Sequence, residues 1–151
     1  MNNEILSYIA GAVDISSTFY ICRSLNKDLL VSRYQAGIQL THNDRNVLLF
    51  IQDHIGGQLV APRINSSRAC WKILVRNYQI SNLINLIRPF LRVKIKHADI
   101  LLTFRETFHY QEKRKYTKGN PEIPQDILDK REECYYELQK LNNENKPLSQ
   151  R

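Results

Sequence analysis

Two helix–strand–strand units follow one another at the start of this 151-residue chain, and this repeat limits the folds open to it. The first unit covers residues 3–41 and the second covers residues 43–76. Two hairpins most simply join into one antiparallel sheet with the helices on one face, so the repeat predicts an α+β fold. Further helices are expected over residues 80–87, 94–108 and 124–141. The expected order is therefore α-β-β-α-β-β-α, followed by C-terminal helices.

The helix expected over residues 3–14 is apolar around most of its circumference, which is typical of a buried helix. Its apolar side chains form two stripes, Ile5, Ile9 and Ala12 in one and Leu6 and Val13 in the other. Small residues lie between the stripes, and they are Ser7, Ala10 and Gly11. Small residues at this spacing let a second helix approach closely. Asp14 closes the helix, at the end where the helix dipole disfavours a carboxylate.

Alternating side chains predict strands over residues 18–25 and 31–41, joined by a turn at residues 26–28. The second strand places Arg33, Gln35, Gln39 and Thr41 on one side, and Tyr34, Ala36, Ile38 and Leu40 on the other. A further hairpin is expected over residues 59–64 and 69–76, turning at residues 65–67, with Lys72 on the polar side. Such a face can read base edges in a DNA major groove. A plainly solvated sheet face accounts for the pattern as well.

Caps and breaks set the other expected boundaries. Asn43 is predicted to cap a helix that runs to Ile55, where Gly56 and Gly57 end it. Residues 111–120 are predicted to form a basic loop, and the tail after residue 141 is expected to fray.

Charge is the informative part of the composition, because 22 Lys and Arg residues against 15 Asp and Glu residues give a net charge of +7. A basic chain of this size is a candidate for nucleic-acid binding, although a generic basic surface is the alternative. No apolar run is long enough for a membrane helix, and the start lacks the features of a signal peptide. Three scattered cysteines argue against a disulfide framework. The abundance of Ile, Asn, Lys and Tyr is typical of AT-rich genomes, such as those of a mitochondrion or chloroplast.

Residues 9–14, Ile-Ala-Gly-Ala-Val-Asp, resemble the LAGLIDADG motif of homing endonucleases and intron maturases. Residues 88–94, Arg-Pro-Phe-Leu-Arg-Val-Lys, and residues 37–41 resemble two further segments of that family. The resemblance covers roughly residues 4–108. It implies an αββαββα core with a four-stranded antiparallel saddle sheet over residues 1–110. Residues 111–151 would then add the basic loop, a C-terminal helix and the tail, packed on or extending from the same domain.

A single copy of the motif resembles the homodimeric branch of the family. The resemblance implies that the first helices of two subunits pack together through Ser7, Ala10 and Gly11. One apolar stripe would face the chain's own core and the other the partner. Two such sheets would form a long groove on a near-palindromic duplex, because a two-fold interface presents the same face twice. Some other protein could instead cover this helix.

The motif departs from the family at the acid. In the family, a second acidic residue two positions after the first holds a divalent metal, such as Mg²⁺, at the scissile phosphates. Here that position is Ser16, and Ile15 stands between, where the family often has a small residue. A neutral hydroxyl is a poor ligand for Mg²⁺, so cleavage is expected to be lost. Asp14 is the remaining candidate metal ligand.

Two other positions match the family's active site. Lys94 matches a basic residue that stabilises charge near the scissile phosphate, and simple phosphate contact is the alternative. His42 stands where the family often has a polar residue that orders the attacking water. The histidine and cysteine spacings give no zinc site.

The sequence thus predicts a LAGLIDADG-type protein that binds DNA, or structured RNA as the family's maturases do, without cutting it. The expected contacts are Tyr20, Ser24, Arg33, Gln35, Gln39, Thr41 and Lys72. One alternative is an active homing endonuclease that uses Mg²⁺ to cut a long near-palindromic site. Another is an interaction module whose groove contacts protein.

Overall fold

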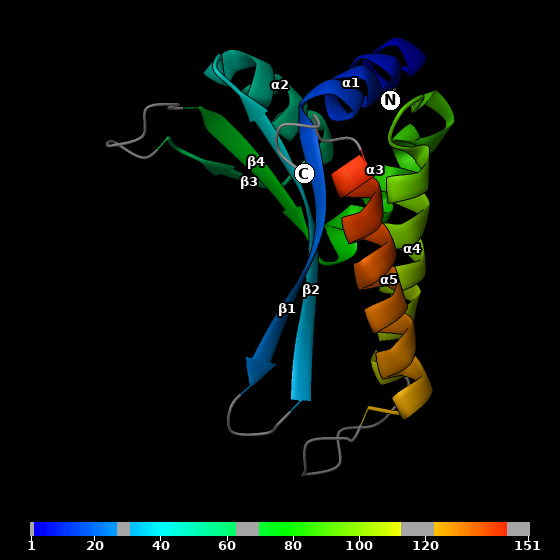
Figure 1. The fold of residues 1–151 in the computed structure, drawn as a ribbon. Helices are drawn as coiled ribbons and strands as arrows, with labels where there is room; N and C mark the ends of the chain where they lie inside the picture. The colour runs from blue at the N-terminus through cyan, green and yellow to red at the C-terminus, as the bar shows by residue number, and fades with distance from the viewer. Residues whose placement is uncertain (1, 27–30, 63–69, 113–122, 145–151) are drawn as a thin grey trace.

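The computed structural model describes residues 2–26, 31–62, 70–112 and 123–144. Within them the strands form one antiparallel sheet in the order β1-β2-β4-β3. The strands are β1 (Ser17–Asn26), β2 (Val31–His42), β3 (Gln58–Val60) and β4 (Trp71–Arg76). Figure 1 shows the long β1–β2 ribbon running beyond the shorter β3–β4 pair, with β1 at the edge of the sheet. The predicted α+β fold with a four-stranded antiparallel sheet is confirmed.

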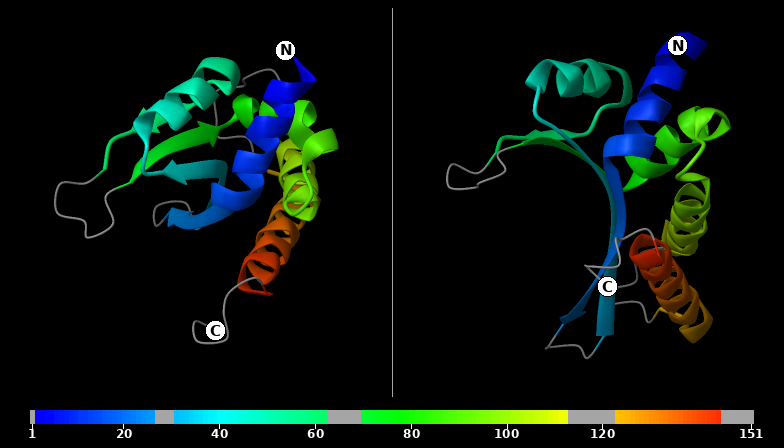
Figure 2. Two further views of the ribbon diagram at one scale, coloured as in Figure 1. Left: turned by 90° about the horizontal axis from the view of Figure 1, so that it is seen from above. Right: turned by 45° about the horizontal axis from the view of Figure 1, so that its top comes forward.

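The helices lie on the convex side of the curved sheet and leave its concave face without a helix (Figures 1 and 2). They are α1 (Asn3–Ser16), α2 (Arg45–Ile55), α3 (Tyr78–Ile87), α4 (Ile95–Glu112) and α5 (Gln125–Glu144). A short 3-10 turn, η1 (Arg88–Phe90), leads from α3 toward α4. None of the helices in the described ranges is both long and apolar enough to cross a membrane.

Side-chain alternation along the strands determines which face is buried. Tyr34, Ile38 and Leu40 of β2 are buried against the helices, together with Ile73 and Val75 of β4. Their neighbours along each strand point to the concave face, called the open face here, because successive side chains of a strand alternate between its two sides. The sequence pattern therefore predicted correctly which side of these strands packs on the helices.

Several predicted boundaries are wrong by a few residues. Asp44, and not Asn43, caps α2, since its carboxylate accepts a hydrogen bond from the Asn46 amide at 2.8 Å. The strand expected over residues 59–64 is shorter, and Pro62, which has no N–H to donate, lies beyond its end. Gly56 and Gly57 end α2 as predicted, with φ values of 73° and 97°.

The C-terminal part of the chain is more helical than expected. Helix α4 extends through Glu112, into the segment predicted to be a loop. Helix α5 extends to Glu144, so residues 142–144 are helical and are not part of a frayed tail. The predicted turn at residues 65–67, most of the predicted basic loop and the end of the tail lie outside the described residues.

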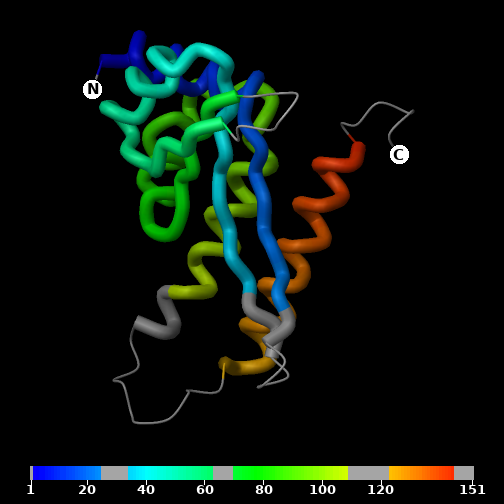
Figure 3. The backbone as a smooth tube through the Cα atoms, turned by 90° about the vertical axis from the view of Figure 1, so that its left-hand side faces the viewer, coloured from blue at the N-terminus to red at the C-terminus, as the bar shows by residue number. Residues whose placement is uncertain are grey.

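Helix α5 packs on α4 and along the edge strand β1, as Figure 3 shows. Its Cys134 and Leu138 belong to the same hydrophobic core as the strands. Burial raises the pKa of the Cys134 thiol to about 11, so this sulfur remains a neutral packing group. Asn142 donates a hydrogen bond to the Phe19 carbonyl at 3.0 Å, and Arg23 pairs with Glu132 at 2.8 Å. These contacts join α5 to β1 along the length of the helix.

Candidate nucleic-acid interface

The strand register arranges the open face of the sheet in rows. Thr41 pairs with Lys72, and Thr18 pairs with Gln39, which pairs with Leu74. The next rows are Tyr20 with Gly37 and Arg76, Cys22 with Gln35, and Ser24 with Arg33. The face thus brings together Tyr20, Ser24, Gln35, Gln39, Thr41 and Lys72, all predicted as contacts, on neighbouring strands. Arg33 holds its place in the register, but its side chain lies outside the described part of the structure.

Sequence reasoning missed three polar residues of this face, which are Thr18, Cys22 and Gln58. It placed Arg76 on the same side of its strand as Lys72 but did not count it among the contacts. The alternation that exposes Tyr20 and Ser24 also exposes Thr18 and Cys22, so the signal was present in β1. Gln58 was missed because the two apolar residues after it, Leu59 and Val60, hide the alternation of β3.

Acidic side chains are segregated from the open face. None of the described side chains of this face is a carboxylate. They lie within Thr18 to Ser24 of β1, Gln35 to Thr41 of β2, Gln58 to Val60 of β3 and Lys72 to Arg76 of β4. The α5 helix on the opposite side carries Asp126, Asp129, Glu132, Glu133, Glu137 and Glu144. The open face therefore offers hydroxyls, amides and cations to a ligand, and no negative charge that would repel phosphate.

Tyr20 and Gly37 form the centre of the open face. The Tyr20 ring lies over Gly37, so closely that a Cβ atom on residue 37 would overlap the ring. Glycine is therefore required there by close approach and not by an unusual backbone angle.

Asp14 connects the end of α1 to the start of α4. One carboxylate oxygen accepts a hydrogen bond from the Arg92 amide at 2.7 Å, and the other accepts from the Lys94 amide at 2.9 Å. The carboxylate thus lies at the N-terminal end of α4, where the helix dipole favours negative charge. Its position at the unfavourable end of α1 is explained by this contact across the chain.

Lys94 is placed beside Asp14 by the same contact. Burial lowers the pKa of Lys94, while the Asp14 carboxylate acts in the opposite direction. One turn further along α4, His97 is buried, and burial together with the nearby Lys94 charge lowers its pKa. Lys94 and His97 thus lie on the interior side of the junction between α1 and α4, where Lys94 is half-buried and His97 is buried.

Ser16 and His42 lie near the row formed by Thr41 and Lys72. The Ser16 hydroxyl donates to the Ala12 carbonyl at 2.7 Å, and the Ser16 carbonyl accepts from the Thr41 hydroxyl at 3.3 Å. His42 accepts a hydrogen bond from the Asp44 amide through Nδ1 at 3.0 Å. The Asp44 carbonyl lies 3.2 Å from the same nitrogen, so Nδ1 is engaged by the main chain whichever tautomer the ring adopts.

These donors do not fit a magnesium ion. Mg²⁺ prefers anionic oxygens in octahedral geometry. Ser16 supplies a neutral hydroxyl that is already bonded to Ala12, and both oxygens of Asp14 accept main-chain N–H groups. Within the described ranges, no group of three or more His, Cys, Asp or Glu side chains is placed to hold a metal ion.

The exposed side of α1 carries Ser7, Tyr8, Gly11 and Ile15. A Cβ atom on Gly11 would meet no atom within 4 Å, so this side of the helix is open. Ala10 was predicted on the same side, and this is wrong, because it is fully buried at 0% exposure in the chain's own core. The prediction that one apolar stripe faces a partner stays a prediction. Leu6, Ile9 and Val13 are in the chain's own core, while Ile5 and Ala12 are only partly buried against it.

Large apolar side chains gather around this open side of α1. Ile15 is 89% exposed and Val93 is 65% exposed. The two hydrogen bonds of Asp14 reach the residues on either side of Val93, which places that residue near the end of α1. Tyr8 contacts Phe50 of α2 edge to face at 5.6 Å between ring centroids, and both rings are partly exposed.

The variant Asp14→Asn is expected to lower the free energy of unfolding by about 2 kcal/mol. Its amide can accept only one of the two main-chain N–H groups, and its own N–H₂ faces the other donor. Urea unfolding measures the change, with Asp53→Asn, an exposed acid of α2, as the matched control. Equal stability of the two variants would show that the Asp14 contacts do not join α1 to α4.

Comparison with protein-family models finds no match, and comparison with curated protein sequences finds none either. Solved structures, in contrast, are similar over most of the chain. The archaeal intron-encoded homing endonuclease I-Vdi141I, complexed with DNA, matches with a TM-score of 0.74 at 19% identity. That match covers 92% of this chain and 84% of the other. The homing endonuclease I-CvuI, in complex with its target in the presence of Ca, matches with a TM-score of 0.72 at 15% identity, covering 93% and 85%.

A third similar structure is that of a much longer chain. The LAGLIDADG homing endonuclease I-GzeII, in complex with a DNA target, matches with a TM-score of 0.67 at 19% identity. The match covers 86% of this chain but only 43% of I-GzeII. These matches extend over most of the chain at TM-scores of 0.67 to 0.74, and the chain therefore has the fold of the LAGLIDADG homing endonucleases.

Proposed function

We propose that this protein binds double-stranded DNA on the open face of its sheet and does not cleave it. The observation that carries the proposal is the carboxylate-free face on which Lys72 and Arg76 lie among amide and hydroxyl side chains. Lysine and arginine contact phosphates, and glutamine pairs with base edges in the major groove. The similar structures I-Vdi141I and I-GzeII are DNA complexes, which supports this reading of the face.

DNA suits this face better than double-stranded RNA does. The major groove of an A-form duplex is deep and narrow, so side chains of a sheet reach its base edges poorly. Gln35 and Gln39 project from the same face of β2, four residues apart with the Gly37 row between them, and the open major groove of B-DNA is wide enough to admit such a β-ribbon. RNA binding in a maturase-like role is therefore the outcome that the experiments below are designed to detect.

The loss of cleavage is proposed from the donor set at the end of α1. The Ser16 hydroxyl and the engaged Asp14 carboxylate leave no free anionic oxygen there to hold a divalent metal against a scissile phosphate. Lys94 keeps a cation at this point, and phosphate contact is the role that its position supports.

We further propose that two copies pair through the exposed side of α1. Gly11 leaves room for a second backbone, and Tyr8, Phe50, Ile15 and Val93 provide apolar surface around it. The chain spans less than half of I-GzeII, so two copies of it correspond in length to that single DNA-bound chain. A two-fold pair would place two open faces on one duplex.

Selection from a randomised duplex pool in Mg²⁺, with bound and cleaved molecules sequenced separately, tests these proposals together. We expect near-palindromic sequences among the bound, intact molecules, because a two-fold pair reads two equal half-sites. The same palindromes among cleaved molecules would contradict the proposed loss of cleavage. Enrichment without symmetry would contradict the pairing, and enrichment only in a parallel RNA pool would replace DNA with RNA.

Lys72→Gln is expected to weaken binding to the selected duplex and to reduce the slope of log affinity against log salt by about 1. The reason is that Lys72 lies on the open face and neutralises one phosphate. Lys140→Gln removes the same charge from α5, on the other side of the sheet, and is the matched control. If both variants lower affinity and slope equally, DNA does not lie on the open face.

Ser16→Asp is expected to create Mg²⁺-dependent cleavage of the selected duplex, since it adds a carboxylate at the position where metal binding is missing. Ser16→Asn, which is neutral and of similar shape, is expected to leave the duplex intact. Agarose gel assay of a plasmid carrying the selected site measures both. Cleavage by the unchanged protein at the same rate would show that Ser16 does not limit the chemistry.

A further inference from the structure

The part of the sheet that lies farthest from α1 is built from β1 and β2 alone. β4 pairs with β2 no further than Gly37, so the rows beyond Gly37 have two strands instead of three or four. We call residues 21–26 and 31–36 the outer ribbon. Figure 1 shows it running past the end of the β3–β4 pair. Two strands alone are marginally stable and twist strongly, so the direction in which their side chains point depends on what packs against them.

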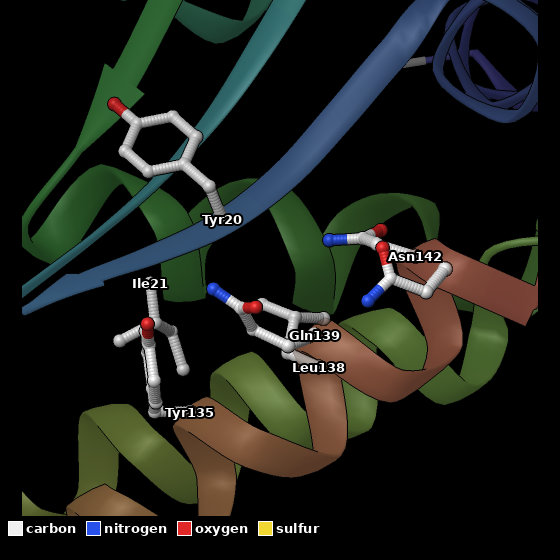
Figure 4. A pocket seen from close by; sticks show the side chains of 7 residues that line it. Tyr20, Ile21, Tyr135, Leu138, Gln139 and Asn142 are labelled. Carbon is white, nitrogen blue, oxygen red and sulfur yellow. The ribbon is translucent and has the colours of Figure 1, made fainter. Parts of the chain in front are cut away.

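Helix α5 packs on the convex side of the outer ribbon. Figure 4 shows Ile21 on the side of β1 that faces Tyr135 of α5, while the Tyr20 ring lies on the other side of the strand. Ile21 and Tyr34 are both buried. The Tyr34 ring contacts the Tyr135 ring edge to face, with 6.4 Å between the ring centroids. The helix thus covers the apolar side of the outer ribbon and leaves its polar side open.

Arg23 connects the outer ribbon to α5 by charge. Its guanidinium donates to the Glu132 carboxylate at 2.8 Å and lies 5.6 Å from the centre of the Tyr135 ring. Both partners of the ion pair are partly exposed, so the pair contributes little to the overall stability of the fold. Its position is what matters, because Ser24, the next residue of β1, points to the opposite side and lies on the open face.

A second contact holds β1 on α5 closer to α1. Asn142 donates to the Phe19 carbonyl at 3.0 Å, while Glu132 accepts from Arg23 further along the strand. One attachment would let the strand pivot on the helix, whereas two separated attachments fix the angle between them. The angle of the outer ribbon is therefore set from behind the face that we propose for DNA binding.

The length of the outer ribbon indicates how much DNA it covers. The four residues from Tyr20 to Ser24 span about 13 Å of strand. This equals the length of about four base pairs at about 3.4 Å each. In the proposed two-fold pair α1 lies at the centre, so the outer ribbon lies over the outer base pairs of each half-site, and the rows backed by β4 lie over the inner ones.

We propose that α5 positions the outer ribbon for DNA recognition, and that Arg23, Glu132 and Tyr135 thereby determine how strictly the outer base pairs are read. The proposal rests on the proposed binding of DNA to the open face. These three are positioning residues, since they contact one another on the convex side and not the ligand. Base edges are read by hydrogen bonds that weaken steeply when their angles change. Release of the ribbon from α5 would therefore affect the outer positions and spare the inner rows, which β4 holds.

Glu132→Arg tests the proposal, because it places a second positive charge beside Arg23 and repels the ribbon from α5. Affinity is measured for the selected duplex and for duplexes with one substituted base pair at each position. In the unchanged protein, a substitution at a contacted position is expected to weaken binding about tenfold. In Glu132→Arg we expect the outer penalties to fall to about threefold or less, and the inner ones to persist.

Glu133→Arg is the matched control. It makes the same change of charge one residue further along α5, where the partner is Lys130 of the same helix. Both variants add positive charge and so raise the affinity for any duplex, but a penalty is a ratio of two affinities and cancels this effect. Glu133→Arg is expected to keep the outer and the inner penalties.

Reversal of the ion pair separates positioning from a general loss of stability. Arg23→Glu combined with Glu132→Arg restores opposite charges at the same place, and it is expected to restore the outer penalties. Arg23→Gln removes the ion pair from the side of the strand and leaves α5 unchanged. It should lower the same penalties, and it provides the test if Glu132→Arg does not fold.

The outcomes distinguish this proposal from the proposed function. Outer penalties that persist in Glu132→Arg and Arg23→Gln, or that fall equally at inner and outer positions, would overturn the positioning role and leave DNA binding intact. Failure of the reversed pair to restore the outer penalties would overturn it too, as would their absence from the unchanged protein. Absence of binding of the unchanged protein to any duplex would overturn the proposed function itself.

Discussion

The hydrogen bonds of the Asp14 carboxylate hold α1 against the start of α4, and the arrangement of the other elements depends on them. The carboxylate closes α1 and, through the Arg92 and Lys94 amides, begins α4, although these residues are 78 and 80 positions apart in the chain. A carboxylate at the C-terminal end of a helix is unfavourable by itself, and this position is stabilised because the same group lies at the N-terminal end of another helix. The contact fixes where Lys94 lies relative to Ser16 and where α1 enters the sheet. It also occupies the carboxylate, so the acid that remains in the motif serves the fold and is not free to hold a metal.

A second buried polar contact, between Arg131 and Thr107, holds α5 on α4. Arg131 of α5 is only 3% exposed and donates to the hydroxyl and the carbonyl of Thr107 on α4, at 3.0 and 3.2 Å. Its guanidinium also lies 3.9 Å above the centre of the Phe108 ring. Burial lowers the pKa of Arg131, as does the charge of Arg105. The hydrogen bonds and the aromatic ring compensate part of the cost of removing this charge from water. α5 is thereby held on α4, and with it the amides that line the edge of β1.

The sequence was sufficient for features that depend on local patterns. Alternation in β2 identified the buried Ile38 and Leu40 and, by the same rule, the polar face that carries Gln35 and Gln39. It was insufficient where the outcome depends on contacts between distant residues. Ala10 was assigned to the wrong side of α1, because the rotation of a helix with two apolar stripes is set by what packs on it. The Asp14 contacts and the hydrogen bond from Asn142 to Phe19 join segments that are far apart in the chain. No local sequence pattern indicates which distant residues will meet. The cap of α2 was misplaced by one residue because Asn43 and Asp44 are equally good caps.

The difference in charge between α5 and the concave face has a consequence for kinetics. α5 carries six acidic residues against three basic ones, while the described side chains of the concave face include Lys72 and Arg76 and no acid. A polyanion therefore attracts the concave face more strongly than it attracts α5, and an approach through that face is favoured. The acids of α5, which touch no ligand in the proposed complex, would thus raise the fraction of encounters that are productive, and dissolved salt would reduce that advantage by screening.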